Sequence, residues 1–429
     1  MSAHLIIIEG PEPGLTVPLN EGIQFIGRDT STDICIPHPS ISKIHASLDL
    51  RSGELTLSDC DSTNGIKVHG NKHKQIKIED QDTFLIGDIL VRFISGSDIK
   101  NTLTDFSNRI PILRNEIKKI IVGQDDVVAQ ILAGIFGGGH CLLTGVPGLA
   151  KTITVNSISK VLNLDFKRIQ FTPDLMPTDI TGTTILDEDE QGRRSFKFVK
   201  GPIFTQLLLA DEINRTPPKT QAALLEAMQE KQVTVGEKTL QLPSPFIVMA
   251  TRNPVEQEGT YILPEAQLDR FMFNINIDYP SPTEEEEILR RTCSPSSVHL
   301  KQIFQASDII RFRKAIERVE TSPLVISYVT ALTRATRPGT KDCPEELNEL
   351  IEYGAGPRAG QYLIRGAKAF AAMEGRSFTT CDDIKKCAIP VLRHRISPSF
   401  KAQATRMSED DLVHKLLSLI PEPEIPQFV

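Results

Sequence analysis

The run Gly145-Val-Pro-Gly-Leu-Ala-Lys-Thr152 is the feature that most constrains how this chain can fold. It follows the apolar segment Cys141–Thr144, which has the character of a buried strand, and it precedes a segment with helical character. A glycine-rich turn between a strand and a helix directs backbone N–H groups and the helix N-terminus toward phosphate oxygens. The run therefore predicts an α/β domain that binds the phosphates of a nucleoside triphosphate.

Two residues of this run have specific expected roles. Lys151 is expected to reach the β- and γ-phosphates, and the Thr152 hydroxyl is expected to ligate magnesium. Ala150 stands where the general pattern has glycine. The alternative interpretation is a glycine-proline turn followed by a chance Lys-Thr pair. The residues expected to contact the nucleotide here are Gly145, Val146, Pro147, Gly148, Leu149, Ala150, Lys151 and Thr152.

A second run argues against the chance interpretation. Four apolar residues, Leu207 to Ala210, are typical of a buried parallel strand, and they end in the carboxylates of Asp211 and Glu212. Adjacent carboxylates at the end of an apolar strand are costly as structure alone. Asp211 is expected to hold magnesium beside the phosphate loop, and Glu212 to polarise the attacking water. We therefore expect an ATPase with ATP and Mg²⁺ as cofactors.

The composition of the 429-residue chain is that of an ordinary globular protein, with 40% hydrophobic and 24% charged residues. Its length suggests about two to four domains. A net charge of −7 argues against a broad nucleic-acid-binding surface. The seven cysteines lack metal-ligand spacing, and no leader peptide or membrane span is recognisable. We expect a cytoplasmic protein with reduced thiols.

The pattern of apolar residues and turn residues changes along the chain. Residues 1–97 contain short β-rich runs separated by turn residues, which predicts an all-β sandwich. Strands and helices alternate over 98–280, as in a parallel α/β core, and helical patterns dominate 281–400. A C-terminal helix and tail are expected over 401–429. The segment Ser95-Gly-Ser-Asp98 is the expected linker between the first two regions.

Residues 98–400 resemble the MoxR family of AAA+ ATPases in several motifs that occur in the family's order. Val122-Gly123-Gln124 resembles the family's segment that lines the adenine pocket. Ala250-Thr-Arg-Asn-Pro254 resembles its sensor 1 motif, in which Asn253 contacts the γ-phosphate or the attacking water. Family members commonly have glutamine where Arg252 stands, so the role of this arginine is open. A simple Asn-Pro turn is the alternative.

Two arginines carry the resemblance further. In the family, the run Pro264-Glu-Ala-Gln-Leu-Asp-Arg270 places an arginine finger in the neighbouring subunit's site, which implies a homo-oligomer, specifically a hexameric ring. The alternative for Arg270 is a surface ion pair with Asp269 or a nearby glutamate. Gly354-Ala-Gly-Pro-Arg358 resembles the sensor 2 motif at the start of a lid helix, in which Arg358 touches the nucleotide of its own subunit, and the resemblance implies that 281–400 form a C-terminal α-helical lid.

Two predicted hairpins correspond to insertions of the same family. Thr183–Leu186 and Ser195–Val199 flank a polar turn, and a second hairpin is expected over 232–242, turning at Gly236-Glu237. The resemblance implies that such insertions contact client proteins. On physical grounds alone they are exposed hairpins.

The N-terminal region resembles a forkhead-associated (FHA) domain in the order of Gly27-Arg28, Ser42-Lys43-Ile-His45 and Ser62-Thr63-Asn64-Gly65. Arg28, Ser42 and Lys43 are expected to surround a phosphothreonine phosphate, and Thr63 and Asn64 to hold the peptide backbone. His45 is expected to be a buried brace between loops. The alternative is a sandwich that keeps these loops only for folding. Thr102, assigned to the linker, is a further hypothetical phosphorylation site.

The favoured function is therefore an ATP-driven remodeller or chaperone whose N-terminal domain recognises phosphothreonine on a protein. Family resemblance also implies partners with von Willebrand factor A domains. The alternatives are a chelatase-like motor for metal or cofactor insertion, and a nucleotide-gated phosphopeptide scaffold with little turnover.

Overall fold

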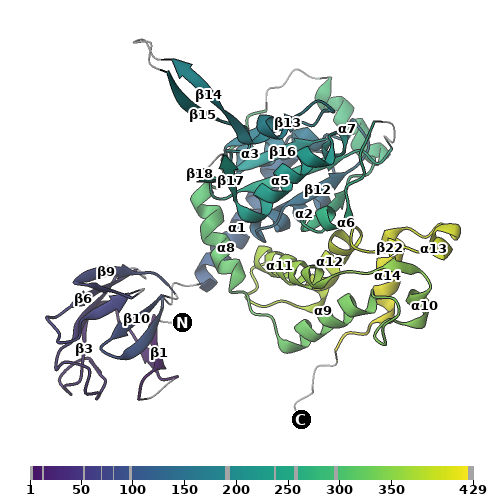
Figure 1. Ribbon diagram of the computed structural model, residues 1–429. Coiled ribbons are helices and arrows are strands. Elements are labelled where there is room, and N and C mark those ends of the chain that lie inside the picture. The colour runs from purple at the N-terminus through teal and green to yellow at the C-terminus, as the bar shows by residue number, and fades with distance from the viewer. Residues whose placement is uncertain are drawn as a thin grey trace. The chain divides into compact units, whose positions relative to one another are not determined.

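The computed structural model describes residues 3–11, 14–51, 54–68, 70–80, 82–95, 99–188, 194–235, 238–255, 259–293 and 298–423. Parts of the expected linker (96–98), of both hairpin turns (189–193 and 236–237) and of the tail (424–429) lie outside these ranges. The chain divides into two compact units, Met1–Asn101 and Thr102–Val429 (Figure 1).

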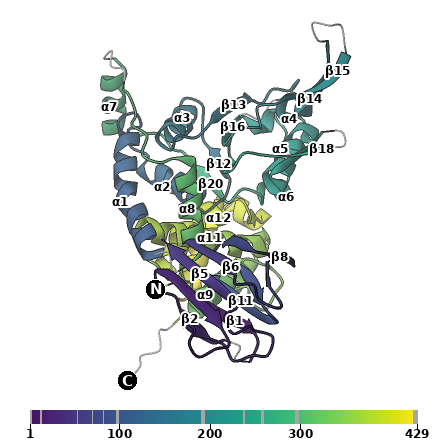
Figure 2. The ribbon, with the colours of Figure 1, turned by 90° about the vertical axis from the view of Figure 1, so that its left-hand side faces the viewer.

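The first unit consists of two β-sheets, as the sequence predicts. One sheet has the strand order β2-β1-β11-β10-β7-β8, and the other has the order β4-β3-β5-β6-β9 (Figure 2). The strands are β1 (His4–Glu9), β2 (Thr16–Pro18), β3 (Gly22–Gly27), β4 (Ile34–Cys35), β5 (Ala46–Arg51), β6 (Glu54–Asp59), β7 (Ile66–Val68), β8 (Asn71–His73), β9 (Gln75–Ile78), β10 (Thr83–Ile86) and β11 (Ile89–Ile94).

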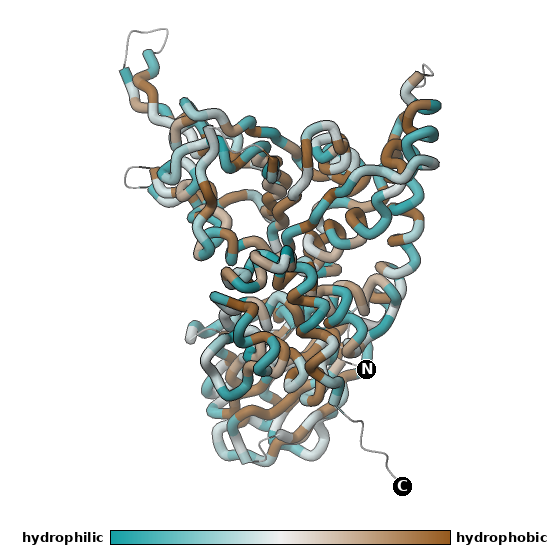
Figure 3. Tube along the Cα trace, turned by 90° about the vertical axis from the view of Figure 1, so that its right-hand side faces the viewer, coloured by the Kyte–Doolittle hydropathy of each residue, from teal (hydrophilic) through white to brown (hydrophobic). Residues whose placement is uncertain are grey.

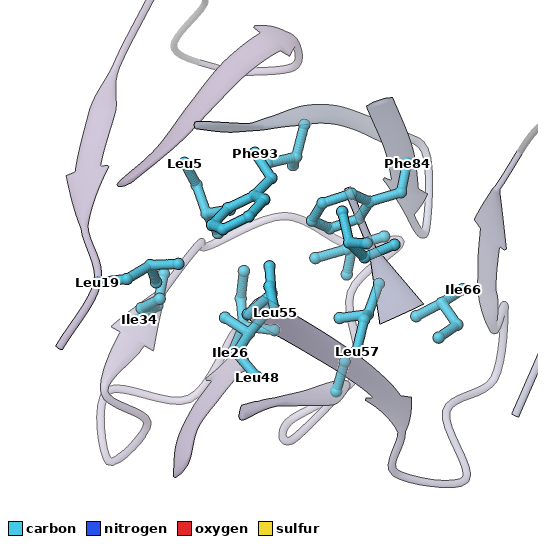
Figure 4. Packing of buried hydrophobic residues seen from close by; sticks show 14 of the residues in the cluster. Leu5, Leu19, Ile26, Ile34, Leu48, Leu55, Leu57, Ile66, Phe84 and Phe93 are labelled. Atoms are coloured by element: carbon cyan, nitrogen blue, oxygen red, sulfur yellow. The ribbon is translucent and has the colours of Figure 1, made fainter. Parts of the chain in front are cut away.

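The core of this unit lies between its two sheets. Leu5 and Phe93 come from one sheet, and Leu48 and Leu57 from the other (Figure 4). Buried and less buried residues alternate along β5 and β11, because successive side chains of a strand point to opposite faces. Burial of each large apolar side chain contributes about 1.5–3 kcal/mol, and this core holds the connecting loops in place.

The second unit is built on a parallel sheet with the order β13-β16-β19-β12-β20. Its central strands are buried along their whole length, which explains their continuous apolar sequences. The carboxyl ends of these strands meet at one edge of the sheet. The strands are β12 (Cys141–Thr144), β13 (Phe166–Gln170), β16 (Leu207–Asp211), β19 (Ile247–Arg252) and β20 (Phe273–Asn276).

Helices surround this sheet and form the C-terminal lid. In Figure 3, hydrophobic and hydrophilic segments alternate along the helices, as expected when one face of each helix is buried. The helices are α1 (Ile99–Lys118), α2 (Asp125–Phe136), α3 (Lys151–Val161), α4 (Pro177–Thr181), α5 (Pro218–Glu230), α6 (Glu265–Leu268), α7 (Pro282–Thr292), α8 (Ala306–Glu317), α9 (Pro323–Ala335), α10 (Glu345–Asn348), α11 (Pro357–Met373), α12 (Cys381–Leu392), α13 (Phe400–Ala404) and α14 (Glu409–Leu419), with a short 3₁₀ turn at Ile213–Arg215.

Three two-stranded sheets complete the second unit. β14 (Gly182–Glu188) and β15 (Arg194–Lys200) form a hairpin that projects from the core (Figure 1), and β17 (Gln232–Val235) pairs with β18 (Lys238–Gln241). In the lid, β21 (Ile351–Tyr353) pairs with β22 (Ser397–Pro398). Among the described residues, every helix is too short or too polar to cross a lipid bilayer.

Thr102 requires a correction. The sequence interpretation assigned it to a linker, but it lies within α1, where it is half-buried.

His140 lies fully buried just before β12. Its Nδ1 accepts a hydrogen bond from the Val248 backbone N–H (3.0 Å), so Nε2 carries the proton and donates to the Met228 carbonyl (3.2 Å). Burial lowers the pKa of His140 from 6.5 to about 4. The structure thus requires a neutral imidazole in this position.

We expect His140 to make the protein less stable in acid. Between pH 6.5 and 4 the unfolded chain binds a proton that the folded chain excludes, so the free energy of unfolding falls as the pH falls. From pH 7 to pH 5 this group accounts for a loss of about 2 kcal/mol. Urea unfolding followed by circular dichroism should show a smaller pH-dependent loss for His140→Gln than for the parent. An equal loss in both proteins would contradict the assignment.

Candidate active site and recognition loops

The carboxyl edge of the parallel sheet brings the predicted phosphate-binding and acidic residues together. A cavity of about 440 Å³ lies where the loop after β12 faces the ends of β16 and β19. Its lining residues are Pro147, Gly148, Leu149, Ala150, Lys151, Thr152, Ile153, Asp211, Glu212, Thr251, Arg252, Asn253 and Ile288. This set contains most of the residues predicted from the two sequence runs.

The backbone of the loop explains its glycines and its one departure from the pattern. Ala150 precedes α3 with φ 57° and ψ 18°, a left-handed conformation that costs a residue with a Cβ about 1–2 kcal/mol. Alanine therefore takes up the backbone shape that glycine adopts more easily. A Cβ on Gly145 would lie 2.7 Å from the Ile277 carbonyl oxygen, so this position has no room for a side chain.

Lys151 begins α3 and lies against its own loop. Its Nζ donates to the carbonyl oxygens of Gly145 and Val146, the latter at 2.9 Å. Burial lowers the pKa of Lys151, while the charges of Asp211 and Glu212 act in the opposite direction. The ammonium group is thus held at the mouth of the loop, between backbone acceptors and the acidic pair.

Asp211 is buried at the end of β16 and is surrounded by oxygen and nitrogen donors. Its Oδ1 accepts a hydrogen bond from the Thr251 hydroxyl (2.6 Å), and its Oδ2 lies 3.4 Å from the Thr152 hydroxyl. A carboxylate beside a hydroxyl is the oxygen set that Mg²⁺ prefers in nucleotide sites. The residues present therefore fit a magnesium ion.

Glu212 follows in a left-handed conformation, with φ 59°. Its carboxylate accepts a hydrogen bond from Gln170 Nε2 (2.6 Å) and lies 3.2 Å from Arg215 Nε. Its backbone N–H donates to the Thr251 hydroxyl (2.8 Å). Thr251 therefore fixes Glu212 relative to Asp211, and the Glu212 carboxylate lines the same cavity as the phosphate loop.

Sequence reasoning missed Arg168 and Gln170 on β13. Arg168 donates to Asp211 Oδ2 from both Nε (2.9 Å) and Nη2 (2.7 Å), and Nη2 also donates to Gln170 Oε1 (2.6 Å). The signal was present, because two polar residues at a spacing of two on a strand lie on one face. Without the strand order, nothing showed that this face lies beside β16.

Arg252 and Asn253 at the end of β19 have different surroundings. Arg252 Nε donates to the Thr144 hydroxyl (2.8 Å), and burial lowers its pKa. This arginine therefore braces the ends of β12 and β19, which answers the question that the sequence left open. Asn253 lines the cavity, and its Oδ1 also accepts a hydrogen bond from the Val255 N–H (3.1 Å). Asn253 therefore both makes a local turn contact and lines the cavity, so the two interpretations of the Asn-Pro sequence are compatible.

A second cavity, of about 490 Å³, contains the segment predicted to line the adenine pocket. Val122, Gly123 and Gln124 line this cavity together with Tyr279. Tyr279 is 76% exposed, and sequence reasoning did not identify it. Gly123 has φ +65°, and a Cβ there would lie 2.3 Å from a Glu284 carboxylate oxygen. Gln124 Nε2 donates to the Leu149 carbonyl (3.5 Å), which links this segment to the phosphate loop.

The two predicted arginines line a third cavity of about 180 Å³, and the phosphate-loop residues are not among its lining residues. Arg270 Nη1 donates to the Leu225 carbonyl (2.6 Å). Arg358 Nη1 pairs with Asp269 Oδ2 (2.8 Å), and Asp269 Oδ1 pairs with Arg395 (2.7 Å). Asp269 thus binds two arginines of the lid. Arg358 therefore lines a different cavity from the phosphate loop, and its expected contact with a nucleotide stays a prediction.

The first unit brings its predicted residues onto neighbouring loops. Ser42 Oγ accepts a hydrogen bond from the Thr63 N–H (3.1 Å), and the Arg28 N–H donates to the Ser42 carbonyl (3.0 Å). His45 is buried: its Nδ1 accepts from the Ser42 N–H (3.1 Å), so its Nε2 donates to the Gly65 carbonyl (3.2 Å). The expected role of His45 as a brace is confirmed.

Of the residues predicted to bind the phosphopeptide, Arg28, Lys43 and Thr63 are exposed. A Cβ on Gly27 would lie 2.0 Å from the Lys43 carbonyl oxygen, so only glycine allows the loops that carry Arg28 and Lys43 to approach this closely. Asn64 is half-buried, and its Nδ2 donates to the Ser40 carbonyl (2.8 Å). Asn64 therefore also braces the loops, a role that sequence reasoning did not assign.

Three family models match the chain. Residues 25–87 match the FHA domain, residues 140–273 match the ATPase family associated with various cellular activities (AAA), and residues 346–416 match the AAA lid domain.

Known proteins are similar over most of the second unit. "Chaperone MoxR1" of Mycobacterium tuberculosis is 43% identical over 310 residues, which is 72% of this chain and 81% of that protein. YeaC of Bacillus subtilis, a protein without a described function, is 38% identical over 72% of this chain and 92% of its own length. A crystal structure from Cytophaga hutchinsonii, described as that of a candidate ATPase, superposes with a TM-score of 0.70 and 42% identity, covering 76% of this chain and 98% of that one.

Proposed function

Because this chain belongs to the MoxR family of AAA+ ATPases and carries an N-terminal FHA domain, we propose that it is an ATP-hydrolysing remodelling chaperone directed by phosphothreonine. The observation that carries the proposal is the single cavity lined by Lys151, Thr152, Asp211, Glu212 and Asn253. These five side chains come from the start of α3 and from the carboxyl ends of β16 and β19, and together they supply a phosphate-binding cation, a metal site and a carboxylate for water activation.

The hydrolytic roles follow from the contacts in this cavity. The loop N–H groups and Lys151 bind the phosphates, and Thr152 with Asp211 holds magnesium, which neutralises phosphate charge when bound. Glu212 accepts a proton from the attacking water as a general base, and Asn253 orients that water. Gln170 and Arg215 position the Glu212 carboxylate through the hydrogen bond and ion pair described above.

The third cavity supports a site shared between subunits. Arg270 and Arg358 line this cavity together with Lys231 and Arg365. Four positively charged side chains therefore line one small cavity. Such a cluster suits the terminal phosphates of a nucleotide bound by a neighbouring copy of the chain. We therefore assign both Arg270 and Arg358 to the neighbour's nucleotide, in a closed ring that the family resemblance makes a hexamer.

The β14–β15 hairpin supports contact with a protein client. Leu186 and Phe196 lie opposite each other on the two strands and are 56% and 82% exposed. An apolar pair on a projecting hairpin suits an exposed apolar segment of a partly unfolded or assembling protein. The family resemblance adds proteins with von Willebrand factor A domains as proposed partners.

The loops of the first unit support phosphothreonine recognition. Arg28 and Lys43 are exposed beside Ser42 and Thr63, and charge-assisted hydrogen bonds from such groups are the usual means of binding a phosphate. The client or a regulator is therefore expected to carry phosphothreonine.

Glu212→Gln should bind ATP and assemble but hydrolyse ATP about 100-fold or more slowly, because it removes the general base while keeping the shape of the side chain. Phosphate release and nucleotide binding should be measured on the same preparation. Normal turnover by this variant would overturn the assignment of the base. Absence of turnover in the parent protein would favour the phosphopeptide scaffold.

Mixing two inactive variants should show whether Arg358 acts on the neighbouring subunit. An Arg358→Ala subunit keeps Glu212, and a Glu212→Gln subunit keeps Arg358. A ring site formed between one subunit of each kind therefore contains both groups. An equimolar mixture should therefore recover ATPase activity at about a quarter of the sites. No recovery, with recovery in the matched mixture of Arg270→Ala and Glu212→Gln, would place Arg358 on its own subunit's nucleotide.

Arg28→Ala should weaken binding of phosphothreonine peptides about tenfold or more, since it removes charge-assisted hydrogen bonds to the phosphate, and should leave ATPase activity unchanged. A phosphothreonine peptide library and its unphosphorylated counterpart serve as probes. Arg51→Ala is the matched control, because Arg51 is an exposed arginine of the same unit that pairs with Asp49. Equal peptide affinity in all three proteins would disprove phosphate recognition at these loops.

A further inference from the structure

We propose that Arg168 is a positioning residue that competes with magnesium for Asp211 and thereby sets the metal affinity of the ATPase site. The inference rests on the proposed function, because it concerns the carboxylate assigned to magnesium. It concerns a side chain to which the sequence analysis assigned no role.

The contacts of Asp211 define the competition. Its Oδ1 is engaged by the Thr251 hydroxyl at 2.6 Å, so Oδ2 is the oxygen directed toward Thr152 and the phosphate loop. Arg168 Nε and Nη2 both donate to this same Oδ2, at 2.9 and 2.7 Å. The guanidinium group and the proposed metal site therefore use one carboxylate oxygen.

The two cations cannot share this oxygen without a cost. Magnesium requires close, near-octahedral oxygen ligands at 2.0–2.1 Å, and a guanidinium group hydrogen-bonded to the same oxygen adds repulsion between like charges. The Asp211 side chain is only 10% exposed, so water screens this repulsion poorly. The Arg168 side chain is 48% exposed, which gives the guanidinium group a path into solvent.

Withdrawal of Arg168 also affects the catalytic base. Arg168 Nη2 donates to Gln170 Oε1 at 2.6 Å, and the amide of Gln170 donates to Glu212 Oε2 at 2.6 Å. Arg168 thus fixes the orientation of the Gln170 amide, which in turn holds Glu212. When Arg168 leaves Asp211, both contacts of Gln170 are loosened. Metal occupancy at Asp211 and freedom of Glu212 are therefore linked through β13.

The competition can be measured without turnover. Mn²⁺ titrations of the full-length chain with ADP, followed by the electron paramagnetic resonance signal of free Mn²⁺ and compared with the same titration of ADP alone, report the metal affinity of the site. Arg168→Met should bind Mn²⁺ about tenfold more tightly than the parent, because it removes the competing charge but keeps an apolar stem. Arg168→Lys keeps the charge without the two-point contact and should lie between the two.

Lys167→Met is the matched control, since it removes one positive charge from the neighbouring position of β13, and it should leave Mn²⁺ affinity at the parent value. Unchanged or weaker Mn²⁺ binding by Arg168→Met would overturn the proposal and make Arg168 a structural partner of Asp211 or a ligand of the phosphates. A parent protein that binds no Mn²⁺ with ADP would instead refute the proposed function.

Discussion

The position of the Asp211 carboxylate is the constraint on which the rest of the site depends. It lies at the end of a strand buried along its whole length, so its charge is stabilised by neighbouring groups rather than by water. Thr251 from β19, Thr152 from α3 and Arg168 from β13 all contact it. Each contact comes from a different element, and the parallel register brings those elements to one edge. The glycine-rich loop, the proposed base and the proposed metal site are therefore arranged around one carboxylate.

A second network connects the lid to the predicted arginine finger. Asp269 precedes Arg270 and binds Arg358 of α11 and Arg395, which follows α12. Arg395 is buried, donates to the carbonyls of Asp269 and Phe271, and lies over the Tyr362 ring at 5.1 Å. Desolvation of Arg395 is offset by these acceptors and by the carboxylate. These bonds connect the lid to the backbone that carries Arg270, the residue proposed to contact a neighbouring subunit.

The parts of the site that could be predicted from sequence are those with short-range signals. Lys151 and Thr152 follow from one loop, and Asp211 and Glu212 from one strand end, because the chemistry requires adjacent residues. The positions of Arg168, Gln170 and Tyr279 in the site depend on which strands and loops are neighbours. No local sequence pattern predicts the order of the strands in a sheet. The cavity that Arg358 lines was not predictable for a related reason: a motif identifies the helix but not the surface that the helix presents. Two sheets and a parallel core were predictable because alternating and continuous apolar runs reflect burial directly.

The two sites of this chain that are proposed to bind phosphate share one backbone feature, although they lie on unrelated folds. In the first unit, a Cβ on Gly27 would lie 2.0 Å from the Lys43 carbonyl oxygen. In the second unit, a Cβ on Gly145 would lie 2.7 Å from the Ile277 carbonyl oxygen. Both glycines end a strand or directly follow one, and both bring a basic residue to a loop rich in N–H donors. A phosphate needs several donors within hydrogen-bond reach, and only a backbone without a side chain allows such an approach. Substitution of either glycine is therefore expected to displace a carbonyl of a neighbouring segment and to disturb local packing together with the proposed phosphate binding.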